Sequence, residues 1–121
     1  MSQLDPELTI NKLLSPLLLV QELAKVSDHA TRYQRAIILG QSLYEKGYKV
    51  QALAAYAVAR ATRSFDPTLP YDFDFNAAYN EIIFDIAQNG LNAVKVSSED
   101  RKLLQELAVN NVSSVKKMLE K

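Results

Sequence analysis

The feature that most constrains this chain is a stretch in which glycine and alanine recur at helical spacing, LGQSLYEKGYKVQALAAYAVARA at residues 39–61. Gly40 lies inside an apolar helical period, where glycine costs about 1 kcal/mol relative to alanine. Small residues and one aromatic line the facing stripes of two helices: Ala36, Gly40 and Leu43 on the first, and Ala52, Tyr56 and Ala59 on the second. Because small residues let two backbones approach closely, we expect an antiparallel hairpin in which Gly40 packs against Ala52.

Start and stop signals place the other helices. They predict helices near 16–26, 28–46, 48–64, 76–90 and 98–118, and a short one up to about Leu14. Pro16 either begins its helix or kinks a continuous one. Gly47 supplies the left-handed residue that commonly ends a helix, and Ser97 is a strong cap for the last one. No segment alternates as a strand does, so the sequence predicts a single all-α domain over residues 1–121, a compact bundle of about five helices.

The connector FDPTLPYDFDF at residues 65–75 separates the hairpin from the C-terminal helices. Its two prolines and three aspartates break any helical period. We expect Asp74 or Asn76 to cap the helix that follows. We also expect Phe73 and Phe75 to attach the connector to the core.

The segment DFDFN at 72–76 begins like a calcium-binding loop. That loop requires a glycine where this chain has Ala77 and a bidentate glutamate where it has Ile83. A weak cation site at Asp66, Asp72 and Asp74 is therefore the less favoured interpretation of this segment.

Composition excludes several classes of protein. The chain has no cysteine, and 14 basic residues balance 14 acidic ones, so neither a disulfide framework nor a strongly cationic nucleic-acid surface is expected. The most apolar segment, Leu13–Ala24, is too short to span a bilayer and contains Pro16 and Glu22. We expect a cytoplasmic protein that does not insert into membranes.

Catalytic and metal motifs are not found in the sequence. His29 is the single histidine, and we expect it to be a solvated residue in the first turn of a helix rather than a lone catalytic base. Six basic residues concentrate on the hairpin, and we expect solvated helix faces rather than a phosphate-binding strip: Arg32, Arg35, Lys46, Lys49, Arg60 and Arg63. We expect no enzyme activity, no cofactor and no metal.

Residues 33–66 resemble a single tetratricopeptide repeat. The resemblance is carried by Leu39, Gly40, Gly47, Ala52, Tyr56 and Ala59. It departs from the family at Ala36 and Leu43, where larger aromatic residues are usual, and at Ser64, which stands at the terminal proline position. A microtubule-interacting-and-transport domain or a generic bundle hairpin would have a similar sequence. The repeat resemblance implies a helical surface that holds a partner protein.

The same resemblance implies which residues face that partner. They lie on the first helix of the hairpin: Gln34, Ile37, Gln41, Tyr44 and Glu45. Repeats that bind the C-terminal carboxylate of heat-shock chaperones have lysine and asparagine where this chain has Ile37 and Gln41, so a peptide or helix of another partner is favoured. We expect a non-enzymatic protein–protein interaction module, a small adaptor or chaperone, and leave homo-oligomerisation open.

A second resemblance covers more of the chain. The C-terminal sequence AYNEI…KVSSEDRKLLQEL resembles the third helix, serine-capped turn and fourth helix of bacteriocin immunity proteins. These are antiparallel four-helix bundles, one helix fewer than the count expected here. The alternative function is therefore a small cytosolic immunity or inhibitor protein.

Overall fold

The computed structural model describes residues 15–91 and 96–120, which form six helices and no strand. The helices are α2 (Pro16–Ala24), α3 (His29–Glu45), α4 (Lys49–Phe65), α5 (Phe73–Asn89), α6 (Ser98–Ala108) and α7 (Ser113–Leu119). The predicted all-α class is confirmed. The helix predicted up to about Leu14 lies outside the described residues.

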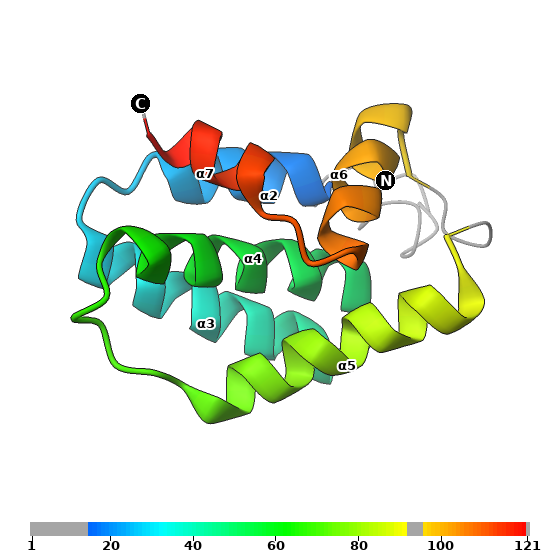
Figure 1. Cartoon of the computed structure of the whole chain (residues 1–121), viewed down its shortest axis with the longest axis horizontal. Helices are drawn as coiled ribbons and strands as arrows, with labels where there is room; N and C mark the ends of the chain where they lie inside the picture. The colour runs from blue at the N-terminus through cyan, green and yellow to red at the C-terminus, as the bar shows by residue number, and fades with distance from the viewer. Residues whose placement is uncertain (1–14, 92–95, 121) are drawn as a thin grey trace, which may run out of the picture.

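Helix α4 is the centre of the bundle (Figure 1). It contacts all five of the other described helices, with α3 beside it as its antiparallel partner. Every residue from 51 to 59 is buried. All but Gln51 are apolar, so this part of α4 is apolar around its whole circumference rather than on one face. Five of these nine residues are alanine, which lets the surrounding helices approach α4 from several sides.

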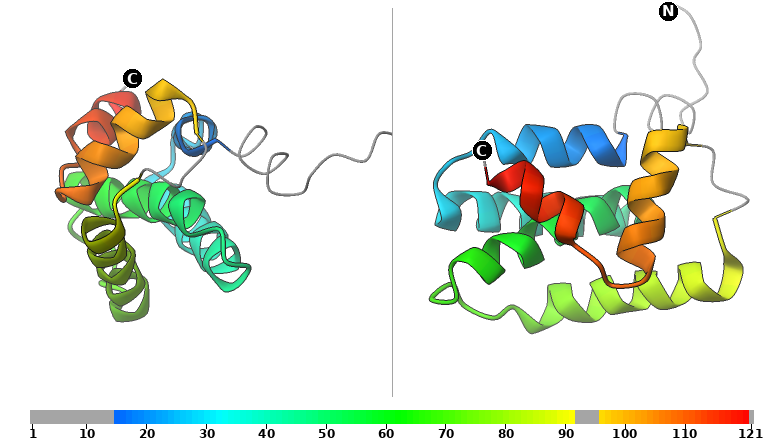
Figure 2. Two further views of the ribbon diagram at one scale, coloured as in Figure 1. Left: turned by 90° about the vertical axis from the view of Figure 1, so that its right-hand side faces the viewer. Right: turned by 45° about the horizontal axis from the view of Figure 1, so that its top comes forward.

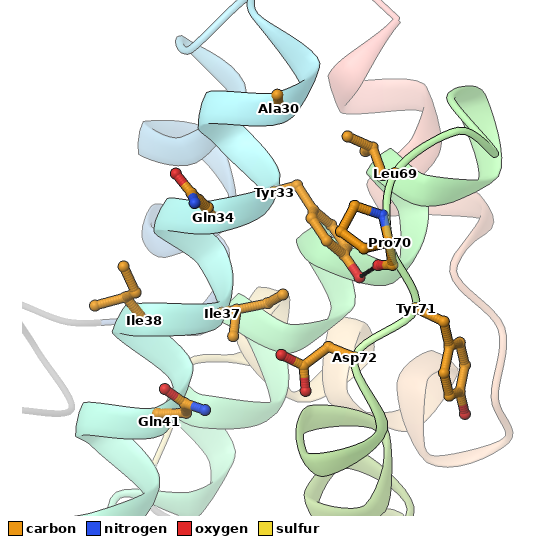
Figure 3. A pocket seen from close by; sticks show the side chains of 10 residues that line it. All are labelled: Ala30, Tyr33, Gln34, Ile37, Ile38, Gln41, Leu69, Pro70, Tyr71 and Asp72. Atoms are coloured by element: carbon orange, nitrogen blue, oxygen red, sulfur yellow. Dashed lines mark hydrogen bonds between the residues drawn. The ribbon is translucent and has the colours of Figure 1, made fainter.

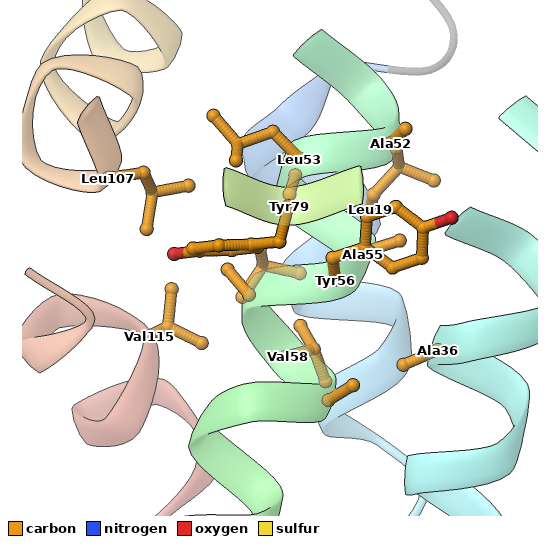
Figure 4. Packing of buried hydrophobic residues seen from close by; sticks show 14 of the residues in the cluster. Leu19, Ala36, Ala52, Leu53, Ala55, Tyr56, Val58, Tyr79, Leu107 and Val115 are labelled. Atoms are coloured by element: carbon orange, nitrogen blue, oxygen red, sulfur yellow. The ribbon is translucent and has the colours of Figure 1, made fainter. Parts of the chain in front are cut away.

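The close approach of α3 and α4 is centred on Gly40 and Tyr56. A Cβ atom at position 40 would lie 2.5 Å from Cδ1 and 3.0 Å from Cζ of the Tyr56 ring. Tyr56 is 1% exposed and is enclosed by other side chains, among them Phe75 at a ring-centroid distance of 5.3 Å (Figure 4). The expected hairpin is confirmed, but the Tyr56 ring, and not Ala52, lies nearest to Gly40.

Helices α3 and α5 each end at a glycine. Gly47 has φ +88° and Gly90 has φ +73°, the left-handed region that glycine enters without strain. After α3, the amide of Tyr48 donates to the carbonyl of Leu43 at 2.9 Å and that of Gly47 to Tyr44 at 3.0 Å. These two bonds form a Schellman motif, which satisfies carbonyls left free at the end of the helix.

The predicted helix over 98–118 is wrong in one respect, because residues 109–112 divide it into α6 and α7. Asn110 has φ 60°, and its amide donates to the carbonyl of Leu107 at 2.8 Å. The amide of Asn111 donates to the carbonyl of Glu106 at 3.0 Å. This is the Schellman arrangement again, with asparagine in the place of glycine.

The start of α5 also differs from the prediction, which began this helix near residue 76. Asp72, and not Asp74 or Asn76, is the cap, and its carboxylate accepts from the amide of Phe75 at 2.9 Å. The helix therefore begins at Phe73, three residues early. Phe75 is buried at 1% exposure as expected, whereas Phe73 is 73% exposed and does not attach the connector to the core.

Asp100 joins the beginnings of two helices. Its backbone amide donates to Ser97 Oγ at 3.1 Å, which is the predicted cap of α6. Its carboxylate reaches α2, where Oδ1 accepts from Ser15 Oγ at 3.0 Å and from the amide of Leu17 at 2.9 Å. Its other oxygen, Oδ2, accepts from Ser97 Oγ at 3.1 Å. The residue is only 2% exposed, so one buried carboxylate accepts hydrogen bonds at the start of both helices.

Tyr79 of α5 carries a buried hydroxyl that has no hydrogen-bond partner among the described residues. Burial raises the pKa of Tyr79 to about 12, so the group stays protonated at neutral pH. The guanidinium of Arg60 lies 4.1 Å from the centroid of its ring, which is a favourable cation–π distance. The ring therefore stabilises the core, whereas its hydroxyl does not.

Gly40→Ala should destabilise the fold, although alanine is the better helix former. The added methyl group overlaps a ring that cannot move, and such overpacking typically costs ~1–3 kcal/mol. Chemical denaturation checks the effect, with the exposed Arg35→Ala as a control on the same helix. In a Tyr56→Ala background the cost of Gly40→Ala should largely disappear; equal costs in both backgrounds would contradict the contact.

Asp100→Ala should lower the free energy of unfolding by about 2 kcal/mol, because it removes the acceptor of the partly buried donors of α2, Ser15 Oγ and the amide of Leu17. Glu99→Ala is the matched control. Glu99 lies in the same turn of α6 but is exposed, so its removal should cost about 0.5 kcal/mol. Similar losses for the two variants would show that Asp100 does not act through α2.

Tyr79→Phe should leave the melting temperature unchanged or raise it, because the substitution removes a buried polar group without a partner. Tyr33→Phe provides the contrast, since the Tyr33 hydroxyl donates to the carbonyl of Pro70 at 2.5 Å. That variant should lose about 1 kcal/mol. A loss in Tyr79→Phe as large as that in Tyr33→Phe would mean that the Tyr79 hydroxyl is satisfied.

Candidate functional site

A groove lies between α3 and the connector at 66–72 and has a volume of about 490 Å³ (Figure 3). Helix α3 forms one wall, and the connector and the start of α5 form the other. The lining residues are Ala30, Tyr33, Gln34, Ile37, Ile38, Gln41, Leu69, Pro70, Tyr71 and Asp72. We call this feature the α3 groove.

Hydrogen bonds hold the connector wall of the α3 groove in place. The Tyr33 hydroxyl donates to the carbonyl of Pro70, as the dashed line in Figure 3 shows. Nε of Arg63 donates to the carbonyl of Leu69 at 3.0 Å, and the Leu69 side chain is buried. Since two residues of the connector are fixed to α3 and α4, the groove is a preformed feature of the fold.

Three of the five predicted partner-facing residues line the α3 groove. Gln34 and Gln41 are exposed on its wall, and Ile37 is in its floor. Ile37 is only 8% exposed, so its side chain belongs mainly to the core. A substitution such as Ile37→Ser would therefore disturb folding as well as binding.

The other two predicted residues lie outside the groove. The hydroxyl of Tyr44 donates to the carboxylate of Glu81, which connects α3 to α5. Glu45 is exposed at the end of α3 and does not line the cavity. Tyr44 thus holds two helices together.

Sequence reasoning missed Ile38, which is 64% exposed at the edge of the α3 groove. The sequence did contain a signal for Ile38. It lies at helical steps of four and three from Gln34 and Gln41, on the same stripe of the helix. The isoleucine interrupts an otherwise polar outer stripe. Tyr71 was also missed; it is 58% exposed and projects from the connector away from α3 (Figure 3).

The side of α5 that faces α3 is acidic. Helices α3 and α5 diverge on the same side of α4 (Figure 2). Because Glu81 contacts Tyr44, the stripe of α5 that contains Glu81 faces α3, and Asp74 and Asp85 lie on that stripe at steps of seven and four. Asp72 adds a further carboxylate to the cavity lining.

The expectation of solvated basic faces is wrong for half of the basic residues on the hairpin. Arg32 is 2% exposed. Arg60 donates to Asn110 Oδ1 at 2.8 Å and to Asn76 Oδ1 at 2.7 Å, and Arg63 is bonded to the connector. Each guanidinium thus reaches back into the bundle, whereas the remaining residues are exposed as expected: Arg35, Lys46 and Lys49.

His29 lies in the first turn of α3, as predicted. It is partly buried rather than fully solvated, with Nδ1 lying 3.9 Å from Oδ2 of Asp66. The carboxylates of the connector are engaged locally, since Asp66 accepts from Thr68 and Asp72 caps α5. Within residues 15–91 and 96–120, no three of the His, Asp and Glu side chains form a group that could hold a metal ion.

None of the helices in the described ranges has the length and apolar character needed to cross a bilayer. The α3 groove offers an apolar floor, two amide side chains, an exposed isoleucine and nearby carboxylates. Comparison with protein-family models, curated proteins and solved structures finds no match to this chain.

Proposed function

We propose that the protein is a non-enzymatic interaction module that binds a peptide segment or helix of a partner protein in the α3 groove. The observation that carries the proposal is the exposure of Ile38, 64%, at the edge of a groove with an apolar floor. An exposed apolar side chain beside a preformed groove is typical of a binding site, and isolated surface apolar residues are otherwise unremarkable.

The surroundings of the α3 groove favour a particular kind of segment. Ile37, Leu69 and the ring of Tyr33 offer a surface for one apolar side chain of the partner. Gln34 and Gln41 can donate to and accept from a peptide backbone. Asp72 and the acidic stripe of α5 favour lysine or arginine beside that apolar residue. The partner segment is therefore apolar and basic.

A second candidate is the immunity-type inhibitor, which would bind its target through another face. Phe73 and Phe84 are 73% and 64% exposed. They lie eleven residues apart on the face of α5 opposite its buried stripe, which contains Tyr79 and Ile82. Two exposed aromatic rings on one helix face are the observation that favours this alternative.

Ile38→Ser should weaken binding about tenfold or more while leaving the free energy of unfolding within about 0.5 kcal/mol of wild type, because the side chain is an exposed anchor. The probe is a set of short peptides selected against the wild-type protein from a random displayed library. Fluorescence anisotropy gives the Kd of each peptide. The selected peptides should share an apolar residue flanked by lysine or arginine, and their affinity should fall as salt is added.

Phe84→Ser is the matched control, since Phe84 is exposed to the same extent as Ile38 but lies outside the α3 groove. It should leave the Kd unchanged. The opposite pattern, with binding lost in Phe84→Ser and kept in Ile38→Ser, would reject the α3 groove and favour the α5 surface of the alternative.

A further inference from the structure

A second cavity, of about 570 Å³, lies at the end of the bundle where the α2–α3 loop, the end of α4 and the end of α7 meet (Figure 1). Its lining includes Lys25, Ser27, His29, Arg32, Phe65 and Glu120. We call it the Arg32 cavity. It is distinct from the α3 groove: successive residues of α3 face the two sites, with His29 and Arg32 in this cavity and Ala30 and Tyr33 in the groove.

Arg32 is a buried cation whose hydrogen bonds are incomplete. Nε donates to Thr62 Oγ1 at 2.9 Å, and Nη1 donates to the carbonyl of Val26 at 2.8 Å. Nη2 has no hydrogen-bond partner among the described residues. Burial lowers the pKa of Arg32, but a guanidinium remains charged at neutral pH. A charge 2% exposed to solvent and lacking a carboxylate partner is costly unless an anion compensates it.

The other charges around the Arg32 cavity do not supply that anion. Lys25 and Glu22 pair with each other at 2.8 Å, and His29 lies 3.9 Å from Asp66. Within the described ranges, no carboxylate lies within 4.0 Å of the Arg32 guanidinium, although Glu120 is part of the lining. Arg32 is therefore the buried positive charge in this part of the fold for which the described residues provide no counterion.

We propose that the Arg32 cavity binds a small oxyanion, a carboxylate or phosphate group, with one oxygen accepting a hydrogen bond from the guanidinium of Arg32. A bond between a guanidinium and an anionic oxygen is among the stronger hydrogen bonds in proteins. Ser27 and Lys25 bring further donors to the lining. The rings of His29 and Phe65, stacked with centroids 6.3 Å apart, form a flat wall against which an organic group attached to the anion can pack.

Inorganic phosphate and acetate are the two probes, each titrated against sodium chloride at equal ionic strength. Binding to the folded state should raise the melting temperature as the concentration of the anion increases. In two-dimensional NMR, the Nε–Hε signal of Arg32 and the amide signals of Ser27 and His29 should shift with the same concentration dependence. A response to phosphate alone or to acetate alone identifies the group that the cavity takes, and either supports the proposal.

Arg32→Gln should weaken binding of the anion about tenfold or more, since a charge-assisted hydrogen bond is lost. Arg35→Gln, an exposed arginine three residues further along α3, should bind as wild type does. If Arg32→Gln does not fold, the NMR titration of the wild-type protein decides. Absence of any shift at Arg32 with both anions would overturn the proposal, as would undiminished binding by a folded Arg32→Gln.

Discussion

The small side chains of α4 set the distance at which the other helices can pack. Five described helices contact this one helix, and large side chains around its whole circumference would keep them apart. Alanine itself buries little apolar area, so most of the hydrophobic stabilisation comes from the larger residues that its neighbours and α4 itself insert between the helices, such as Leu53, Tyr56 and Leu107. The absence of a side chain at Gly40 extends the same principle to α3, where it leaves room for one aromatic ring.

The packing of the helices on α4 also determines where the α3 groove lies. Helices α3 and α5 both pack on α4 and then diverge, which leaves the groove between α3 and the connector that precedes α5. The connector at 66–72 forms one side of the groove and is fixed there through Pro70. The groove is therefore built from rigid elements, while the residues that would select a partner, Ile38, Gln34 and Gln41, lie on a regular helix.

Features that depend on neighbouring residues were predictable from the sequence, and features that depend on distant ones were not. Gly47 and Ser97 mark helix ends through local backbone geometry, and both predictions are confirmed. The contact of Tyr44 with Glu81 and the burial of Arg32 depend on how the helices pack, which no local spacing reveals. Asn110 is the exception. Asparagine is one of the residues that adopt the left-handed conformation at helix ends, so this break was a local feature that sequence reasoning overlooked.

The hydrogen bonds between Asp100 and the start of α2 affect the order in which the chain can fold during synthesis. Ser15 and Asp100 are 85 residues apart, and α2 also packs against α6 and α7. When α2 leaves the ribosome, Ser15 can already cap it, but Asp100 and the helices on which α2 packs do not yet exist. The hairpin of α3 and α4 can form from nearby contacts, whereas α2 must wait for the end of the chain. Because closing such a long loop has a high entropic cost, we expect these contacts of α2 to form late in folding.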